Sequence, residues 1–124
     1  MKKLSPRTHG VLDYITVLFL LISPQIFGMQ GTAASFTIAL GIVHLVLTSF
    51  TNFPMGIFKI VPFKWHGIIE IIVAITLIGV AFYFKTGGDS VSFYFYIGFS
   101  VVLFFVWLVS NYGPSSSLPE IHDV

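Results

Sequence analysis

The sequence predicts an all-α protein: a bundle of four transmembrane helices made of two helical hairpins that point the same way. Of the 124 residues, only 9% are charged and 56% are hydrophobic. A soluble domain of this size has too much surface to bury so many apolar side chains. The chain also contains four apolar stretches of about 20 residues, the length at which a helix crosses a bilayer. Short polar turns separate the first stretch from the second and the third from the fourth.

The four predicted spans leave little of the chain outside the membrane, so we expect a single membrane domain over residues 1–124. The spans cover residues 10–28, 32–51, 66–84 and 91–110. Their apolar runs do not alternate with polar residues, which argues against the strands of a transmembrane β-barrel. The connector of residues 52–65 is apolar, contains two prolines and is expected to lie in the headgroup plane. Residues 111–124 are predicted to form a polar tail.

The basic residues predict the orientation of the bundle. Five of the six precede the first span or lie between the second and the third: Lys2, Lys3, Arg7, Lys59 and Lys64. Loops that face the cytoplasm carry the excess of Lys and Arg. We therefore expect a multi-pass protein of a bacterial-type cytoplasmic (inner) membrane, with both termini in the cytoplasm. The net charge of +1 argues against nucleic acid, which requires a basic face. The expected partners are the lipid bilayer and either a second copy of the chain or another membrane protein.

A short motif recurs at the start of the first and third spans. His9-Gly-Val-Leu-Asp13 matches His66-Gly-Ile-Ile-Glu70, an offset of 57 residues between positions 9 and 66. Apolar residues match easily by chance, but a His-Gly followed by an acid at both positions does not. The match predicts an internal duplication of one hairpin, with the two copies related by an axis along the membrane normal.

The first hairpin resembles the SPW-repeat family of small multi-pass membrane proteins, which are built from two-span repeats. The resemblance rests on the His-Gly and the acid, on Ile22-Ser23-Pro24 and on Gly28 before the turn. Gln25 stands where the family has Trp, and the second hairpin has Gly79-Val80-Ala81 in place of the motif. The resemblance implies a multi-pass membrane protein without an assigned activity.

Five ionisable side chains within or at the ends of the predicted spans are the candidates for chemistry, because polar groups in hydrocarbon are costly and often functional. They are His9, Asp13, His44, His66 and Glu70. A spacing of four residues puts each His and its acid on one helix face, and all five fall in the predicted cytoplasmic half. The second span also carries a polar stripe that includes Thr37, Thr48 and Thr51. If this stripe meets the His and acid faces, a polar interior runs down the bundle.

Three roles are open for this cluster. Imidazoles and carboxylates suit zinc, iron or manganese, and His44 alone lies deep enough for a haem ligand. The same groups form proton relays in membranes. In the third role they pair with one another and lock the hairpins together, because buried charges must be paired.

We expect the third role, in a structural or partner-binding membrane module without a cofactor. A metal- or haem-binding or proton-translocating protein is the alternative. The sequence has no Gly-rich phosphate loop and no His-Glu-x-x-His motif. It also has no cysteine, which excludes thiolate metal sites. An enzyme is therefore not expected.

Overall fold

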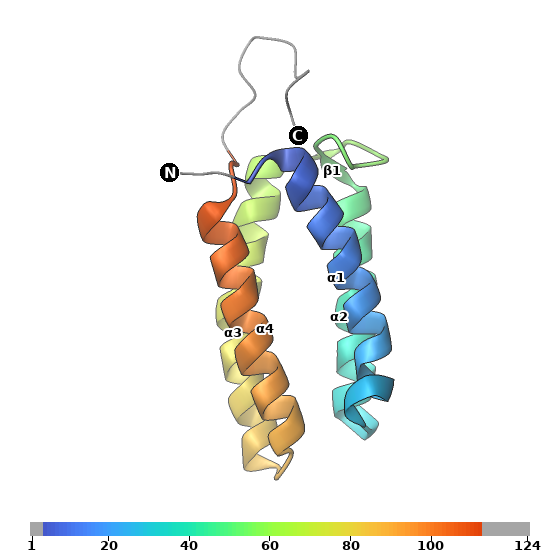
Figure 1. The fold of residues 1–124 in the computed structure, drawn as a ribbon, viewed down its shortest axis with the longest axis vertical. Helices are drawn as coiled ribbons and strands as arrows, with labels where there is room; N and C mark the ends of the chain where they lie inside the picture. The colour runs from blue at the N-terminus through green and yellow to red at the C-terminus, as the bar shows by residue number, and fades with distance from the viewer. Residues whose placement is uncertain (1–3, 113–124) are drawn as a thin grey trace.

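The structure, a computed structural model, describes residues 4–112 and arranges them as two antiparallel helix pairs (Figure 1). The helices are α1 (Pro6–Phe27), α2 (Gly31–Ser49), α3 (Phe63–Thr86) and α4 (Ser90–Val109). All four are long and apolar enough to cross a membrane. The predicted all-α four-helix bundle is thus confirmed. Lys2, Lys3 and positions 113–124 of the predicted tail lie outside the described residues.

Local sequence signals set the helix ends. α1 begins at Pro6 rather than at position 10, because the Ser5 side chain accepts a hydrogen bond from the Thr8 N–H and caps the helix. Proline suits the first turn, where its missing N–H leaves no bond unmade. The helix ends at Gly28, which takes the left-handed conformation with φ 68°. At the start of α4 the Asp89 carboxylate accepts a hydrogen bond from an N–H of the first turn.

The connector between the hairpins contains a short element that the sequence does not predict. β1 (Thr51–Asn52) pairs in parallel with β2 (Val61–Pro62). α2 therefore ends at Ser49 rather than at position 51, and α3 begins at Phe63 rather than at position 66. The pairing brings the chain after α2 back beside the start of α3.

Side chains of the two hairpins form a common core. Leu20 and Ala33 of the first hairpin pack with Ala74, Leu77 and Tyr96 of the second. Among the described residues this core spans both hairpins, so side chains fill the space that separates the ribbons in Figure 1.

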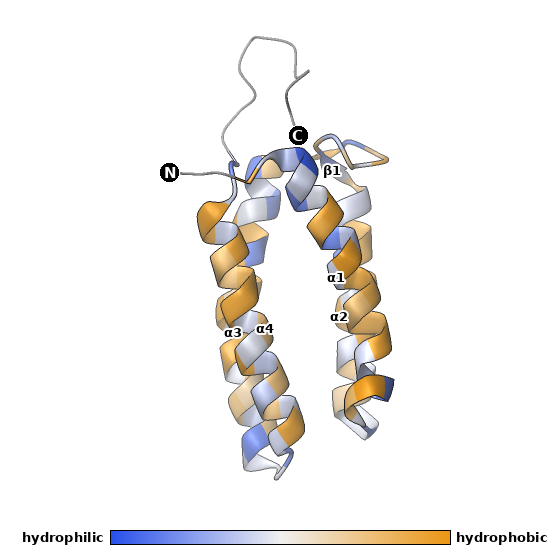
Figure 2. Ribbon diagram, viewed as in Figure 1, coloured by the Kyte–Doolittle hydropathy of each residue, from blue (hydrophilic) through white to orange (hydrophobic). Residues whose placement is uncertain are grey.

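The outer surface of the bundle is apolar. In each helix, only 22% to 33% of an apolar stretch of 18 residues is buried inside the bundle. Figure 2 shows hydrophobic residues along the outside of both hairpins for most of their length. A surface of this kind is compatible with a multi-pass membrane protein, in which hydrocarbon rather than water contacts the helices.

The two ends of the described chain meet at one end of the bundle. Leu4 N donates to Val109 O at 3.0 Å, and Asn111 N donates to Leu4 O at 3.0 Å. β1 lies at the same end (Figure 1). The starts of α1 and α3 and the residues that follow α2 and α4 therefore surround one site.

Candidate metal centre

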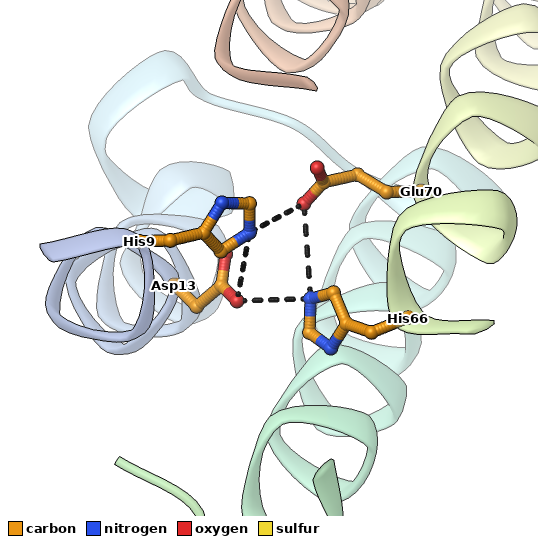
Figure 3. A group of neighbouring side chains, drawn as sticks. All are labelled: His9, Asp13, His66 and Glu70. Carbon is orange, nitrogen blue, oxygen red and sulfur yellow. Dashed lines mark hydrogen bonds and ion pairs between the residues drawn. The ribbon is translucent and has the colours of Figure 1, made fainter. Parts of the chain in front are cut away.

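The first turns of α1 and α3 bring four of the predicted side chains face to face. His66 Nε2 lies 3.0 Å from Asp13 Oδ2, and His9 Nε2 lies 3.2 Å from Glu70 Oε2. The two contacts within each helix are 3.4 Å between His9 Nε2 and Asp13 Oδ2 and 3.8 Å between His66 Nε2 and Glu70 Oε2. Figure 3 shows the two imidazoles and the two carboxylates around a common centre. One nitrogen or oxygen from each residue lies within 4.8 Å of all the others.

These four side chains are withdrawn from the surroundings. His9 and His66 are fully buried, and Asp13 and Glu70 retain 3% and 4% of their exposure. Two carboxylates buried so deeply require a compensating positive charge, because an unpaired ion in a low-dielectric interior is very costly.

His44 lies beside this group and contacts Asp13. Its Nε2 is 3.5 Å from Asp13 Oδ1, the carboxylate oxygen that does not contact the other two imidazoles. The structure thus brings all five predicted residues together, four at the centre and His44 behind Asp13.

A hydroxyl group fixes the tautomer of His9. Ser110 Oγ lies 2.7 Å from His9 Nδ1 and donates its hydrogen to Val106 O at 2.5 Å. A hydroxyl has a single hydrogen to donate, so Ser110 accepts a hydrogen bond from His9 Nδ1–H.

The same arrangement recurs at His66. Thr51 Oγ1 lies 2.8 Å from His66 Nδ1 and donates to Leu47 O at 2.6 Å. Both histidines therefore carry a hydrogen on Nδ1. In a neutral imidazole the other nitrogen is then a bare acceptor, and both Nε2 atoms face carboxylate oxygens. Acceptors that face acceptors require a cation between them, either added protons or a metal ion.

The hydrogen-bond geometry at the centre is incomplete. Among the described residues, Asp13 Oδ2, His44 Nε2 and His66 Nε2 are buried atoms without a hydrogen-bond partner. His66 Nε2 and Asp13 Oδ2 lie 3.0 Å apart as an ion pair, without the alignment of a regular hydrogen bond. A metal ion does not require one ligand atom to point at another. It requires several lone pairs to converge on it.

The separations between the ligand atoms suit a single ion. Nitrogen and oxygen ligands about 2.0–2.2 Å from a tetrahedral zinc ion lie about 3.3–3.6 Å apart. Four of the six separations run from 3.0 to 3.8 Å and bracket this range, and the two across the group are within 4.8 Å.

Each of the four residues at the centre also has an outer partner that fixes its orientation. Tyr112 Oη donates to Glu70 Oε1, the oxygen that does not contact the imidazoles. Burial and the charge of Glu70 both raise the pKa of Tyr112 above its usual range, so the hydroxyl keeps its proton. Outer partners of this kind orient metal ligands and tune their basicity. The pairs are His9 with Ser110, His66 with Thr51, Asp13 with His44, and Glu70 with Tyr112.

Aromatic rings cover the centre at the end of the bundle. The Phe63 ring centroid lies 5.2 Å from that of His9, and the Phe53 centroid lies 5.7 Å from that of His66. The glycine of each His-Gly makes room for this cover. A Cβ atom at Gly67 would lie 2.8 Å from the Tyr112 ring, and one at Gly10 would lie 2.9 Å from the Phe53 ring.

The sequence did not identify Ser110 or Tyr112 as part of the site. A signal was nevertheless available. Thr51 precedes Asn52-Phe53, and Ser110 precedes Asn111-Tyr112. The recurring hydroxyl-Asn-aromatic triplet marks the residues that return to the site at the end of each hairpin.

The polar stripe of the second span is buried but interrupted. Thr37, Thr48 and Thr51 are all fully buried. Thr37 Oγ1 lies 2.5 Å from Tyr96 Oη in the half of the bundle away from the cluster. Leu20 and Leu77, each 1% exposed, lie about 10 Å along their helices beyond the acids. This apolar layer separates the Thr37 hydrogen bond from the cluster, so the polar interior considered from the sequence is not continuous.

No family model, no curated protein and no solved structure matches the chain. The resemblance to the SPW-repeat family therefore stays a prediction, and the function is argued from the site itself.

Proposed function

We propose that this small membrane protein binds one divalent transition-metal ion between His9, Asp13, His66 and Glu70. The observation that carries this proposal is the pair of fixed tautomers. Ser110 and Thr51 place a hydrogen on each Nδ1, so that in the neutral imidazoles both Nε2 atoms keep a lone pair beside two carboxylate oxygens. A divalent cation at the centre receives all four lone pairs and balances both carboxylates. Binding, rather than a catalysed reaction, is the activity that we assign.

The donor set indicates the class of metal. Imidazole nitrogen and carboxylate oxygen suit zinc, iron or manganese, whereas soft ions prefer thiolate and thioether sulfur, and no sulfur belongs to this group of four residues. All four ligand atoms lie within 4.8 Å of one another, which supports one ion rather than two.

A structural role without a metal is the second candidate. His9 Nε2 and Glu70 Oε2 lie 3.2 Å apart with hydrogen-bond geometry, and two imidazolium ions with two carboxylates also form a neutral group. The group would then lock the hairpins together in a module whose apolar faces contact lipid, a second copy or another membrane protein. We favour the metal because Asp13 Oδ2 and His66 Nε2 make no hydrogen bond within the described residues.

Metal analysis of purified protein distinguishes the two candidates. The protein is produced with zinc, iron and manganese supplied, purified in detergent without chelator and measured by mass spectrometry of the elements. We expect about one ion per chain and its loss in Glu70→Gln. Asp89→Asn, which changes the acid of the outer turn, is the matched control and should keep the ion. Wild-type protein that holds no metal, and whose melting temperature responds neither to chelator nor to added metal, would refute metal binding and favour the paired group.

We also propose that the two hairpins derive from one duplicated unit, as the recurring His-Gly and acid motif indicates. The hydrogen bonds that the two histidines donate to hydroxyls support this. His9 of the first hairpin bonds to Ser110 at the end of the second, and His66 of the second bonds to Thr51 at the end of the first. Exchange of this kind is expected for two copies related by an axis along the membrane normal.

We propose that the metal centre lies on the cytoplasmic side of a bacterial-type cytoplasmic membrane. Arg7, Lys59 and Lys64 belong to this end of the bundle, whereas Lys85 belongs to the other, and positive residues favour the cytoplasmic side. Because the chain has no cysteine, the orientation can be tested with single cysteines at positions 64 and 85. A membrane-impermeant thiol reagent added to intact cells should label the cysteine of Lys85→Cys and spare that of Lys64→Cys; the reverse pattern would refute the orientation.

A further inference from the structure

We propose that a small uncharged molecule, of the size of a diatomic gas, reaches the metal centre from the hydrocarbon of the bilayer and binds there. This inference rests on the proposed metal site and adds the ligand class that the site accepts.

A cavity between α2 and α3 leads to the cluster. Its volume is about 50 Å³. Among the described residues that line it, His44 and Glu70 are polar, and the others are apolar side chains such as Leu40, Val43 and Val73. Glu70 is a proposed metal ligand, and His44 holds Asp13. The cavity therefore reaches the cluster at Glu70, one of its four proposed ligands, and at His44.

The cavity opens toward lipid. Val43 and Ile69, which line it, are 63% and 38% exposed on the apolar outer surface of the bundle. Small uncharged molecules dissolve in hydrocarbon, whereas ions do not enter it readily. One water molecule needs about 10–15 Å³ of cavity volume measured in this way. The cavity of about 50 Å³ therefore has room for a molecule of a few heavy atoms. A porphyrin, which the sequence left open as a ligand of His44, is far too large for it.

The large groove on the opposite side of the bundle does not reach the cluster. A groove of about 790 Å³ between α1 and α4 is lined by Ile15, Phe19 and Phe95 among other residues, but by no member of the His and acid cluster. At the repeat offset, Val101 stands where the first hairpin has His44. His44, the one histidine of the cluster without a counterpart in the second hairpin, lines the cavity. Its Nε2 lies 3.5 Å from Asp13 Oδ1 without a hydrogen bond within the described residues, so the imidazole stands between the cavity and Asp13.

The proposed coordination allows a further ligand. A zinc site with four ligands can expand to five, and iron(II) held by histidines and a carboxylate is known for open positions. Binding at such a position requires no electron transfer and leaves the four protein ligands in place.

Nitric oxide is a suitable probe because it is small, uncharged and forms a paramagnetic complex with iron(II). Protein purified without oxygen and loaded with iron(II) is titrated with nitric oxide, and the iron–nitrosyl signal is followed by electron paramagnetic resonance. The iron content of each sample is measured separately. We expect wild-type protein to form the complex. We expect Val73→Phe, which fills the cavity, to keep its iron and bind nitric oxide about tenfold more weakly, or about 1.4 kcal/mol.

Ile72→Phe is the matched control, because Ile72 is 56% exposed on the same helix and lines neither space; it should behave as wild type. If Val73→Phe does not fold, Val43→Trp at the mouth of the cavity replaces it, with the same expected result. Iron-loaded wild type without a nitrosyl signal would overturn this inference and leave the metal site intact, as would equal binding by the filled and control variants. Wild type that takes up no iron or other metal would instead overturn the metal site and, with it, this inference.

Discussion

Replacing Thr51 by valine removes one hydroxyl from beside the proposed metal centre and preserves the shape of the side chain. Thr51 Oγ1 is buried, accepts from His66 Nδ1 at 2.8 Å and donates to Leu47 O at 2.6 Å. In the variant, metal-free His66 can move its hydrogen to Nε2, where carboxylates lie nearby. Metal binding must then reverse this change and leave Nδ1–H buried without a partner.

The expected loss of metal affinity follows from the unpaired His66 Nδ1–H. A buried donor without a partner costs about 1–3 kcal/mol, and loss of an outer partner typically weakens a metal site about 10–100-fold. These two figures agree, since each factor of ten is about 1.4 kcal/mol. We expect zinc affinity to fall about 10–100-fold while the protein remains folded.

The assay is a competition between the protein in detergent and a zinc-binding chromophore at neutral pH. Thr76→Val is the matched control, because Thr76 also donates to the carbonyl four residues earlier, at 2.8 Å, but is exposed and contacts no histidine. Equal zinc affinity in the two variants would refute the role of Thr51 in fixing the tautomer of His66.

Three further outcomes are expected. Gly67→Ala should weaken metal binding, because the new methyl group would lie 2.8 Å from the Tyr112 ring, whereas Gly98→Ala, where no neighbouring atom lies within 4 Å, should leave metal titrations unchanged. Leu77→Ala should lower the unfolding free energy in detergent by about 2–5 kcal/mol, because Leu77 is 1% exposed, while Leu18→Ala at 64% exposure should have little effect; equal losses in chemical unfolding would contradict this. Tyr112 should make the protein less stable as pH rises above about 10. Its pKa is raised by burial only in the folded state, so unfolding releases its proton. Tyr112→Phe should remove this part of the pH dependence of unfolding, and identical slopes would contradict it.

The sequence predicted the helical part of the fold well, because the bilayer imposes both the length and the composition of a spanning helix. Each observed helix overlaps a predicted span, and the differences fall at the ends. The start of α1 depends on the cap at Ser5 and that of α3 on the backbone pairing of Val61 with Thr51. Such end effects are local hydrogen bonds that hydropathy does not register.

The sequence also predicted the membership of the cluster, because ionisable residues stand out in apolar spans and the i,i+4 spacing assigns each pair to one face. It did not predict Ser110 and Tyr112. A serine at a helix end and a tyrosine near a membrane interface are common, and only their distances to His9 and Glu70 identify them as part of the site.

The sequence by itself therefore determined a bundle of four helices that are long and apolar enough to span a membrane, and the five ionisable residues inside it, because each of these follows from local composition and helical periodicity. Only the tertiary structure decided how these residues act on one another. The hydrogen on each Nδ1 is fixed by a hydroxyl from the other hairpin, at His9 by Ser110 and at His66 by Thr51. That choice depends on atoms far apart in the chain that meet when the hairpins pack, and it turns the Nε2 atom of each buried histidine toward the carboxylates.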